Sequence, residues 1–177
     1  MLFALSLGSP VLSTGCLVAE APEYGAPEQT PPFINTTLVT PPLFVVLEAR
    51  PRETIQLTVP FRSEDAGEAL TASLWLDYNM PNQDPQGDHE KAPASLDDLD
   101  RSVTISWGPN SVPSGCHTLT LLLMHDSSYD DVLDLPKEGR DTDVASVTWI
   151  VNKLDSAVPA PGDAVLTNCP SAGGIVQ

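Results

Sequence analysis

Basic residues are scarce in this sequence. Lysine and arginine number 8 against 24 aspartates and glutamates, which gives a formal net charge of −16 at pH 7. Binding to phosphates needs clustered positive charge, so the composition argues against nucleic acid or an anionic lipid surface as the partner. The negative excess suits a protein outside the cell, where like charge limits association.

The motifs of common enzyme chemistry are also missing. The chain has no G-x-S-x-G nucleophile elbow, no H-E-x-x-H motif, no G-x-x-x-x-G-K loop and no G-x-G-x-x-G fingerprint. His117 and His125 lie on one expected strand, about 26 Å apart at the usual rise, so they cannot share a metal ion. His89 lies in a polar loop. We therefore expect neither catalytic activity nor a cofactor.

Long apolar runs and helical patterns are absent as well. The apolar start of the chain breaks at residues 8–10 and meets Glu20, so it falls short of the roughly 20 residues that a membrane span needs. The 18 prolines, which remove backbone donors, argue against a helical protein and lie mostly in linkers or at the ends of apolar runs.

What the sequence does contain is a series of short strand-like segments separated by turn residues. In the segment 54–61, residues Ile55, Leu57, Val59 and Phe61 share one face, which predicts a half-buried strand. The segment 116–125 is apolar on both faces near its end, which predicts a central strand. The complete set comprises residues 33–39, 43–48, 54–61, 70–78, 102–107, 116–125 and 145–151.

These seven strands, with no helix between them, predict an all-β fold, an immunoglobulin-like β-sandwich over residues 33–155. The segment Pro113-Ser114-Gly115-Cys116-His117-Thr118-Leu119 resembles the turn into the penultimate strand of bacterial immunoglobulin-like modules. No cysteine lies on the segment 54–61, so the inter-sheet disulfide of antibody domains is not expected.

The N-terminal segment Leu12-Ser13-Thr14-Gly15-Cys16 resembles the lipobox of bacterial lipoproteins. The resemblance implies a signal peptide over residues 1–15, cleavage before Cys16 and a lipid on that cysteine. It places the protein in the cell envelope, on the periplasmic or surface face of a bacterial membrane. The alternative is a short apolar N-terminus with a chance Gly-Cys pair.

Residues 16–32 are rich in proline, alanine and glutamate and carry few large apolar side chains, which predicts an extended tether. Residues 156–177 form a proline-containing C-terminal tail beyond the last strand. If the lipid occupies Cys16, Cys116 and Cys169 remain as the one disulfide pair in an oxidising compartment. Cys116 has the outward parity of Thr118 and Thr120, so this bond would pin the tail to the sandwich.

The acidic loop after the penultimate strand is the best candidate for a cation site, with Asp126, Asp130, Asp131 and Asp134 as its carboxylates. Its spacing begins like a calcium-binding EF-hand loop and then departs, because Asp131 replaces the required glycine and Lys137 the closing glutamate. We favour a solvated acidic loop over a calcium site. A second cluster, at residues 97–100 after Ser95, is interpreted as one capped helical turn.

Trp75 stands out because alternation places it opposite Leu74 and Leu76, on the face expected to meet solvent. Two interpretations remain. The C-terminal tail pinned through Cys169 covers it, or it is an aromatic platform for a sugar ring or a peptide. We favour coverage by the tail, because the apolar residues of the tail need a surface to pack against.

The sequence therefore predicts a non-enzymatic binding or scaffolding module, attached to a membrane through its lipid. Its partner would be another envelope protein or a surface glycan. The alternative is a secreted accessory domain that binds carbohydrate or calcium, with Trp75 and the loop after Asp126 as the discriminating features.

Overall fold

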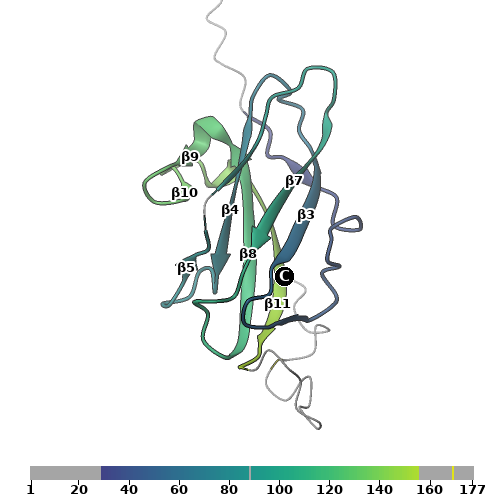
Figure 1. Cartoon of the computed structure of the whole chain (residues 1–177). Coiled ribbons are helices and arrows are strands. Elements are labelled where there is room, and N and C mark those ends of the chain that lie inside the picture. Colours follow the sequence, from purple (N-terminus) through teal and green to yellow (C-terminus); the bar gives the residue numbers. More distant parts are fainter. Residues whose placement is uncertain (1–28, 88, 156–168, 170–177) are drawn as a thin grey trace, which may run out of the picture.

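The computed structural model describes residues 29–87, 89–155 and Cys169 (Figure 1). The expected signal peptide, Cys16, most of the tether and most of the tail lie outside these residues. The helices that it describes are two single 3-10 turns, η1 (Asp126–Ser128) and η2 (Asp141–Asp143). No helix in the described ranges is long and apolar enough to cross a membrane.

Two sheets, antiparallel except for the β2–β11 pair, make up the body of the molecule. The first sheet has the order β1-β3-β7, formed by β1 (Phe33–Ile34), β3 (Ile55–Arg62) and β7 (Asp100–Trp107). The second has the order β2-β11-β8-β4-β5, with β6 also paired to β4; its strands are β2 (Leu47–Ala49), β4 (Leu70–Leu76), β5 (Asp84–Pro85), β6 (Glu90–Ala92), β8 (Gly115–His125) and β11 (Val144–Lys153).

The strand order defines the fold class. β1, β3 and β7 share one sheet and β4, β8 and β11 the other, as the A, B, E and C, F, G strands do in immunoglobulin domains. The N-terminal segment crosses between the sheets: β1 pairs with β3, whereas β2 pairs in parallel with the last strand, β11. The predicted all-β, immunoglobulin-like sandwich is confirmed.

All seven expected strands are present, but the first two are much shorter than the apolar pattern suggested. Asn35 accepts the amide of Leu38 in a turn, and Pro42 accepts the amide of Val45 in the next. Prolines 41 and 42 cannot donate to a sheet, so residues 35–46 connect the layers. Four short strands that the sequence did not suggest are added, β5, β6 and the hairpin of β9 (Tyr129–Asp130) and β10 (Leu135–Pro136).

The capped helical turn expected after Ser95 does not form. Ser95 Oγ accepts the amide of Asp98 at 3.2 Å, as a cap would, and Asp98 in turn accepts the amide of Asp100 at 3.1 Å. The chain then enters β7 directly at Asp100. Side-chain bonds therefore hold a turn here in place of a helix.

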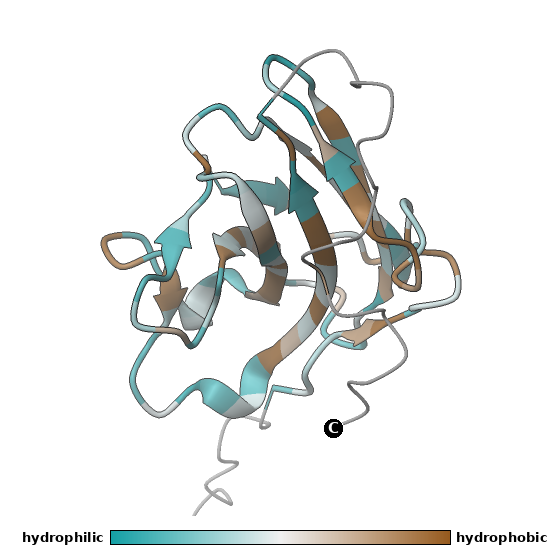
Figure 2. Ribbon diagram, turned by 90° about the horizontal axis from the view of Figure 1, so that it is seen from below, coloured by the Kyte–Doolittle hydropathy of each residue, from teal (hydrophilic) through white to brown (hydrophobic). Residues whose placement is uncertain are grey.

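The core lies between the two sheets, where the inward residues of the alternating strands meet. Figure 2 shows this alternation as brown and teal segments along the strands. Trp107 and Trp149 each place the indole N–H on an acceptor, Gln86 Oε1 at 3.1 Å and the carbonyl of Pro41 at 2.8 Å. Buried aromatic residues of this kind supply much of a core's apolar area, and a bonded N–H avoids a desolvation cost.

The predicted disulfide between Cys116 and Cys169 is confirmed. Their Cα atoms lie 5.0 Å apart, and the bond closes a loop with a sequence separation of 53. Cys169 is buried, with its sulfur 3.6 Å from the carbonyl oxygen of Val151 on β11. The bond therefore ties Cys169 to the start of β8, next to the last strand.

Removing this bond should destabilise the sandwich measurably. A crosslink that closes a loop of this size stabilises a fold by about 4 kcal/mol in the chain-entropy model. We expect Cys169→Ser to lower the melting temperature by about ten degrees or more. Thermal unfolding followed by circular dichroism measures this, with Cys16→Ser as the control that leaves the melting temperature unchanged. Equal melting of the oxidised and reduced wild-type protein would contradict the prediction.

Candidate functional site

The acidic loop folds back over the outer face of β4 and β8, and its first carboxylate is already engaged. Asp126 accepts hydrogen bonds from Lys91 Nζ at 2.7 Å and from Thr71 Oγ1 at 2.6 Å. The bond from Lys91 has the largest effect and the bond from Thr71 the next, and together they hold the pKa of Asp126 below its ordinary value. An ammonium group therefore occupies the position that a cation would take at this carboxylate.

The other three aspartates are directed to different places. Asp130 Oδ1 accepts the amides of Val132 and Leu133 at 2.9 and 3.1 Å, and so shapes the tip of the β9–β10 hairpin. Asp134 accepts the phenol of Tyr129, while Asp131 is exposed. Within the described ranges, no three side chains of the types His, Cys, Asp and Glu gather as metal ligands would. The structure thus does not bring the four candidate ligands together.

Trp75 is buried, so the interpretation as an exposed platform was wrong, while the C-terminal tail that was expected to cover it lies, apart from Cys169, outside the described residues. It is 4% exposed and packs with Leu122, Met124 and Tyr129 in a second apolar cluster outside the sandwich. Its indole N–H donates to the carbonyl of Asp134 at 3.2 Å. The cover is the β9–β10 hairpin, which buries the ring because the outer faces of β4 and β8 are apolar at this point.

The ionisation of Tyr129 makes the stability of this hairpin cover depend on pH. Burial, and then the hydrogen bond to Asp134, raise the pKa of its phenol above the ordinary value. A raised pKa means that the fold favours the neutral phenol. The stabilisation is therefore complete below about pH 10, the pKa of an unfolded tyrosine, and is lost as the pH rises through the folded value.

We expect Tyr129 to ionise after Tyr78, together with uncovering of Trp75. Alkaline titration followed by tyrosinate absorbance and tryptophan fluorescence measures both events. Tyr129→Phe should remove the late absorbance phase, whereas Tyr78→Phe, the control on the same cluster, should keep it. A late phase that persists in Tyr129→Phe would assign it to another residue and refute the prediction.

A buried chain of Ser63, His125 and Asp143 is the feature that sequence reasoning missed. His125 Nδ1 lies 2.6 Å from Asp143 Oδ1, and its Nε2 lies 3.2 Å from Ser63 Oγ. All three side chains are buried: Ser63 is 1% exposed, His125 0% and Asp143 3%. The sequence did indicate that His125 is buried, because it continues the alternation that places Leu119, Leu121 and Leu123 on the inward face of the strand.

The order Ser–His–Asp is that of hydrolase triads, but the surroundings differ. A nucleophile needs room for a substrate carbonyl and nearby free amides for the oxyanion. Ser63 is closed off from solvent, and its own amide donates to the carbonyl of Leu99 at 3.1 Å. The Ser63–His125 hydrogen bond joins the two sheets, because Ser63 follows β3 in one sheet and His125 ends β8 in the other.

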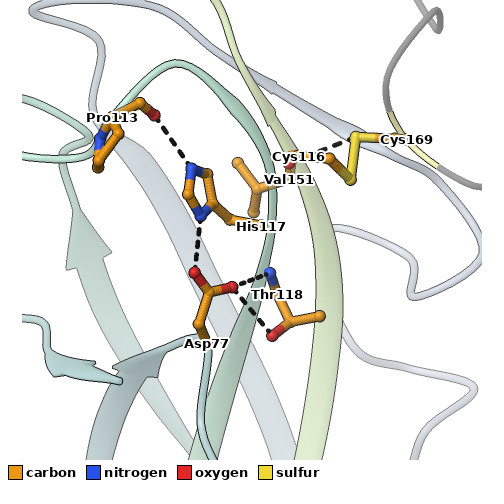
Figure 3. The surroundings of a disulfide bond; sticks show 7 residues. All are labelled: Asp77, Pro113, Cys116, His117, Thr118, Val151 and Cys169. Atoms are coloured by element: carbon orange, nitrogen blue, oxygen red, sulfur yellow. Dashed lines mark hydrogen bonds and ion pairs between the residues drawn. A yellow bond between two sulfur atoms is a disulfide. The ribbon is translucent and has the colours of Figure 1, made fainter. Parts of the chain in front are cut away.

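A second histidine–carboxylate pair lies at the opposite end of β8, beside the disulfide (Figure 3). His117 Nδ1 lies 2.8 Å from Asp77 Oδ2, and its Nε2 lies 3.1 Å from the carbonyl of Pro113. The other oxygen of Asp77 accepts the amide of Thr118 at 3.0 Å. With both oxygens bonded, Asp77 fixes the turn after β4 against the start of β8.

A groove of about 910 Å³ runs over the outer face of the β1-β3-β7 sheet. Two of its side chains are large, apolar and exposed: Phe33 at 68% and Leu38 at 60%. Its further lining comes from the same sheet and from the connection between β6 and β7, and includes Thr58, Pro60, Pro93, Asp98, Arg101 and Ser102.

Arg101 gives this groove polar character. Its Nη1 donates to the carbonyl of Pro93 at 2.6 Å, and its guanidinium carbon lies 5.2 Å from the centroid of the Phe61 ring. Nε and Nη2 are buried and have no hydrogen-bond partner among the described residues. Desolvation lowers the pKa of Arg101. These nitrogens are closed off from the groove, so the exposed apolar side chains of Phe33 and Leu38 are the features that a partner could contact.

No family model matches the chain, and no curated protein matches it. Among solved structures, it is similar to the CARDB domain of a Pyrococcus furiosus protein in complex with di-metal ions, at 8% identity and a TM-score of 0.34 over 62% of this chain and 81% of that one. It is also similar to an ASH/PapD-like domain, domain 7, of human CEP192, at 8% identity and a TM-score of 0.35 over 81% and 97%. Likeness at this level carries no functional argument, so the fold class rests on strand order.

Proposed function

We propose that this protein is a non-catalytic binding or scaffolding module, held at a bacterial membrane by a lipid on Cys16. The observation that carries the binding role is the groove with Phe33 and Leu38. On a chain with a net charge of −16, two exposed apolar side chains beside a groove mark an interaction surface rather than a solvated one.

The absence of catalysis is supported by how the polar residues of the described part are used. The Ser63–His125–Asp143 chain is enclosed, the His117–Asp77 pair fixes a turn, and the four loop aspartates bond within the protein or face solvent. Each of these groups except the exposed Asp131 therefore has a structural role that accounts for its position.

The burial of Trp75 supports a protein over a sugar as the partner. The carbohydrate-binding alternative depended on an exposed Trp75, and that ring is covered by the β9–β10 hairpin. The groove offers the exposed apolar side chains of Phe33 and Leu38, which fit a protein segment better than a sugar. We therefore propose another envelope protein as the partner.

The position of Gln29 supports attachment at one end of the sandwich. Its side-chain nitrogen donates to Ser127 Oγ at 2.8 Å, and Thr30 donates its amide to Asp65 at 2.9 Å. Gln29 and Thr30, the first residues that the structure describes, therefore contact the end of the sandwich at which β8 reaches His125.

The lipid is tested by mass spectrometry of the native protein expressed from its own start codon. We expect an N-terminus at Cys16 that carries acyl chains, because one chain alone binds membranes only marginally and stable anchoring needs more than one. Cys16→Ser should release the protein from the membrane fraction. Recovery of an intact Met1, or of the wild type in the soluble fraction, would refute the anchor.

The groove is tested with the double variant Phe33→Ser, Leu38→Ser. We expect a pull-down from the envelope fraction to recover at least about tenfold less partner than the wild type does, because apolar anchors dominate such contacts. Leu133→Ser is the matched control: Leu133 has the same 60% exposure as Leu38 but lies on the β9–β10 hairpin. Equal recovery by the double variant and the wild type would exclude the groove as the binding surface.

A further inference from the structure

Strand β7 is the one long free edge in the described part of the molecule. It has eight residues and pairs only with β3. The other edge strands are short: β1 and β5 have two residues each, and β2 and β6 have three. Proteins commonly keep exposed edges short or guard them, because unpaired backbone groups accept a further strand. β7 is neither short nor, over Asp100–Trp107, interrupted by proline or lysine.

The register shows which backbone groups of β7 are free. Thr58 exchanges both of its backbone hydrogen bonds with Thr40, on the side away from β7. Its opposite residue, Thr104, therefore directs its N–H and C=O away from β3. By the same alternation Ser102 and Ser106 do so too. The backbone groups of these three residues have no partner among the described residues, and all three side chains are exposed.

We propose that the β7 edge pairs with the β7 edge of a second copy of this chain, antiparallel, about a two-fold axis at Thr104. The sequence Ser102-Val103-Thr104-Ile105-Ser106 has the same order of residue types in both directions, as an isologous contact requires. Ser102 then lies opposite Ser106 of the second copy, and Val103 opposite Ile105. About six main-chain hydrogen bonds would join the two sheets.

The charges along the edge are compatible with this pairing despite the net charge of the chain. The five central residues are uncharged, and hydroxyl pairs across strands are favourable. In this register Asp100 lies opposite Gly108 of the second copy, so no two carboxylates face each other directly. The remaining repulsion comes from the overall acidity and is screened by salt. Dimerisation should therefore strengthen as ionic strength rises.

The experiment is sedimentation of the full-length chain carrying Cys16→Ser, over a wide range of concentration, against the same chain carrying Thr104→Pro. We expect a monomer–dimer equilibrium in the first. Proline at 104 removes an N–H that bonds nothing in the monomer. In the dimer each copy would donate this N–H to the other, so the substitution removes two hydrogen bonds across the two-fold axis. The dissociation constant of the dimer should rise at least about tenfold.

A second variant keeps the proposal testable if proline disturbs the fold. Thr104→Lys places two like charges opposite each other at the two-fold axis and should weaken the dimer by a similar factor. Leu133→Lys is the control, since Leu133 is exposed on the β9–β10 hairpin and adds the same charge away from the β7 edge. It should leave the equilibrium unchanged.

Amide hydrogen exchange supplies the structural readout. Protection of the amides of Ser102, Thr104 and Ser106 should rise with protein concentration in the wild-type edge and not in Thr104→Lys. A chain that stays monomeric at high concentration and high salt overturns the proposal. A dimer that persists in Thr104→Pro and Thr104→Lys with the wild-type dissociation constant also overturns it, and shows that copies meet elsewhere.

Discussion

Strand β8 is apolar on both faces, and this constraint organises the rest of the molecule. Its odd-numbered leucines pack between the sheets, while Leu122 and Met124 point to the other side, where they would meet water. A strand of this kind is stable only when a second layer covers its outer face. The segment from η1 to η2 supplies that layer, and the burial of Trp75 on neighbouring β4 follows from it.

The fold class could be predicted because alternation within single strands is local information. β3, β7 and β11 each bury every second residue, and the pattern is legible without knowledge of their partners. The extent of β1 and β2 could not be predicted in this way. Residues 33–46 look apolar and strand-like, but they lie where the chain crosses between layers, and two prolines and two turns end the pairing.

The candidate sites could be predicted less well, since they depend on contacts between distant segments. The pairing of Cys116 with Cys169 followed from a count of three cysteines. The β9–β10 hairpin over Trp75 could not be predicted, because parity says which face a residue is on, not what lies over that face. His125 was missed for a related reason: its partners, Ser63 and Asp143, lie 62 and 18 residues away along the chain.

The disulfide also determines how the domain would respond to mechanical load. Tension between the N-terminal side and a point beyond Cys169 would pass along the backbone to Cys116 and cross there through the sulfur–sulfur bond. The rest of β8, the β9–β10 hairpin and β11 lie inside the closed loop and are excluded from that path. Pulling could extend the chain before Cys116, but it could not lengthen the part of the domain that contains the central strand.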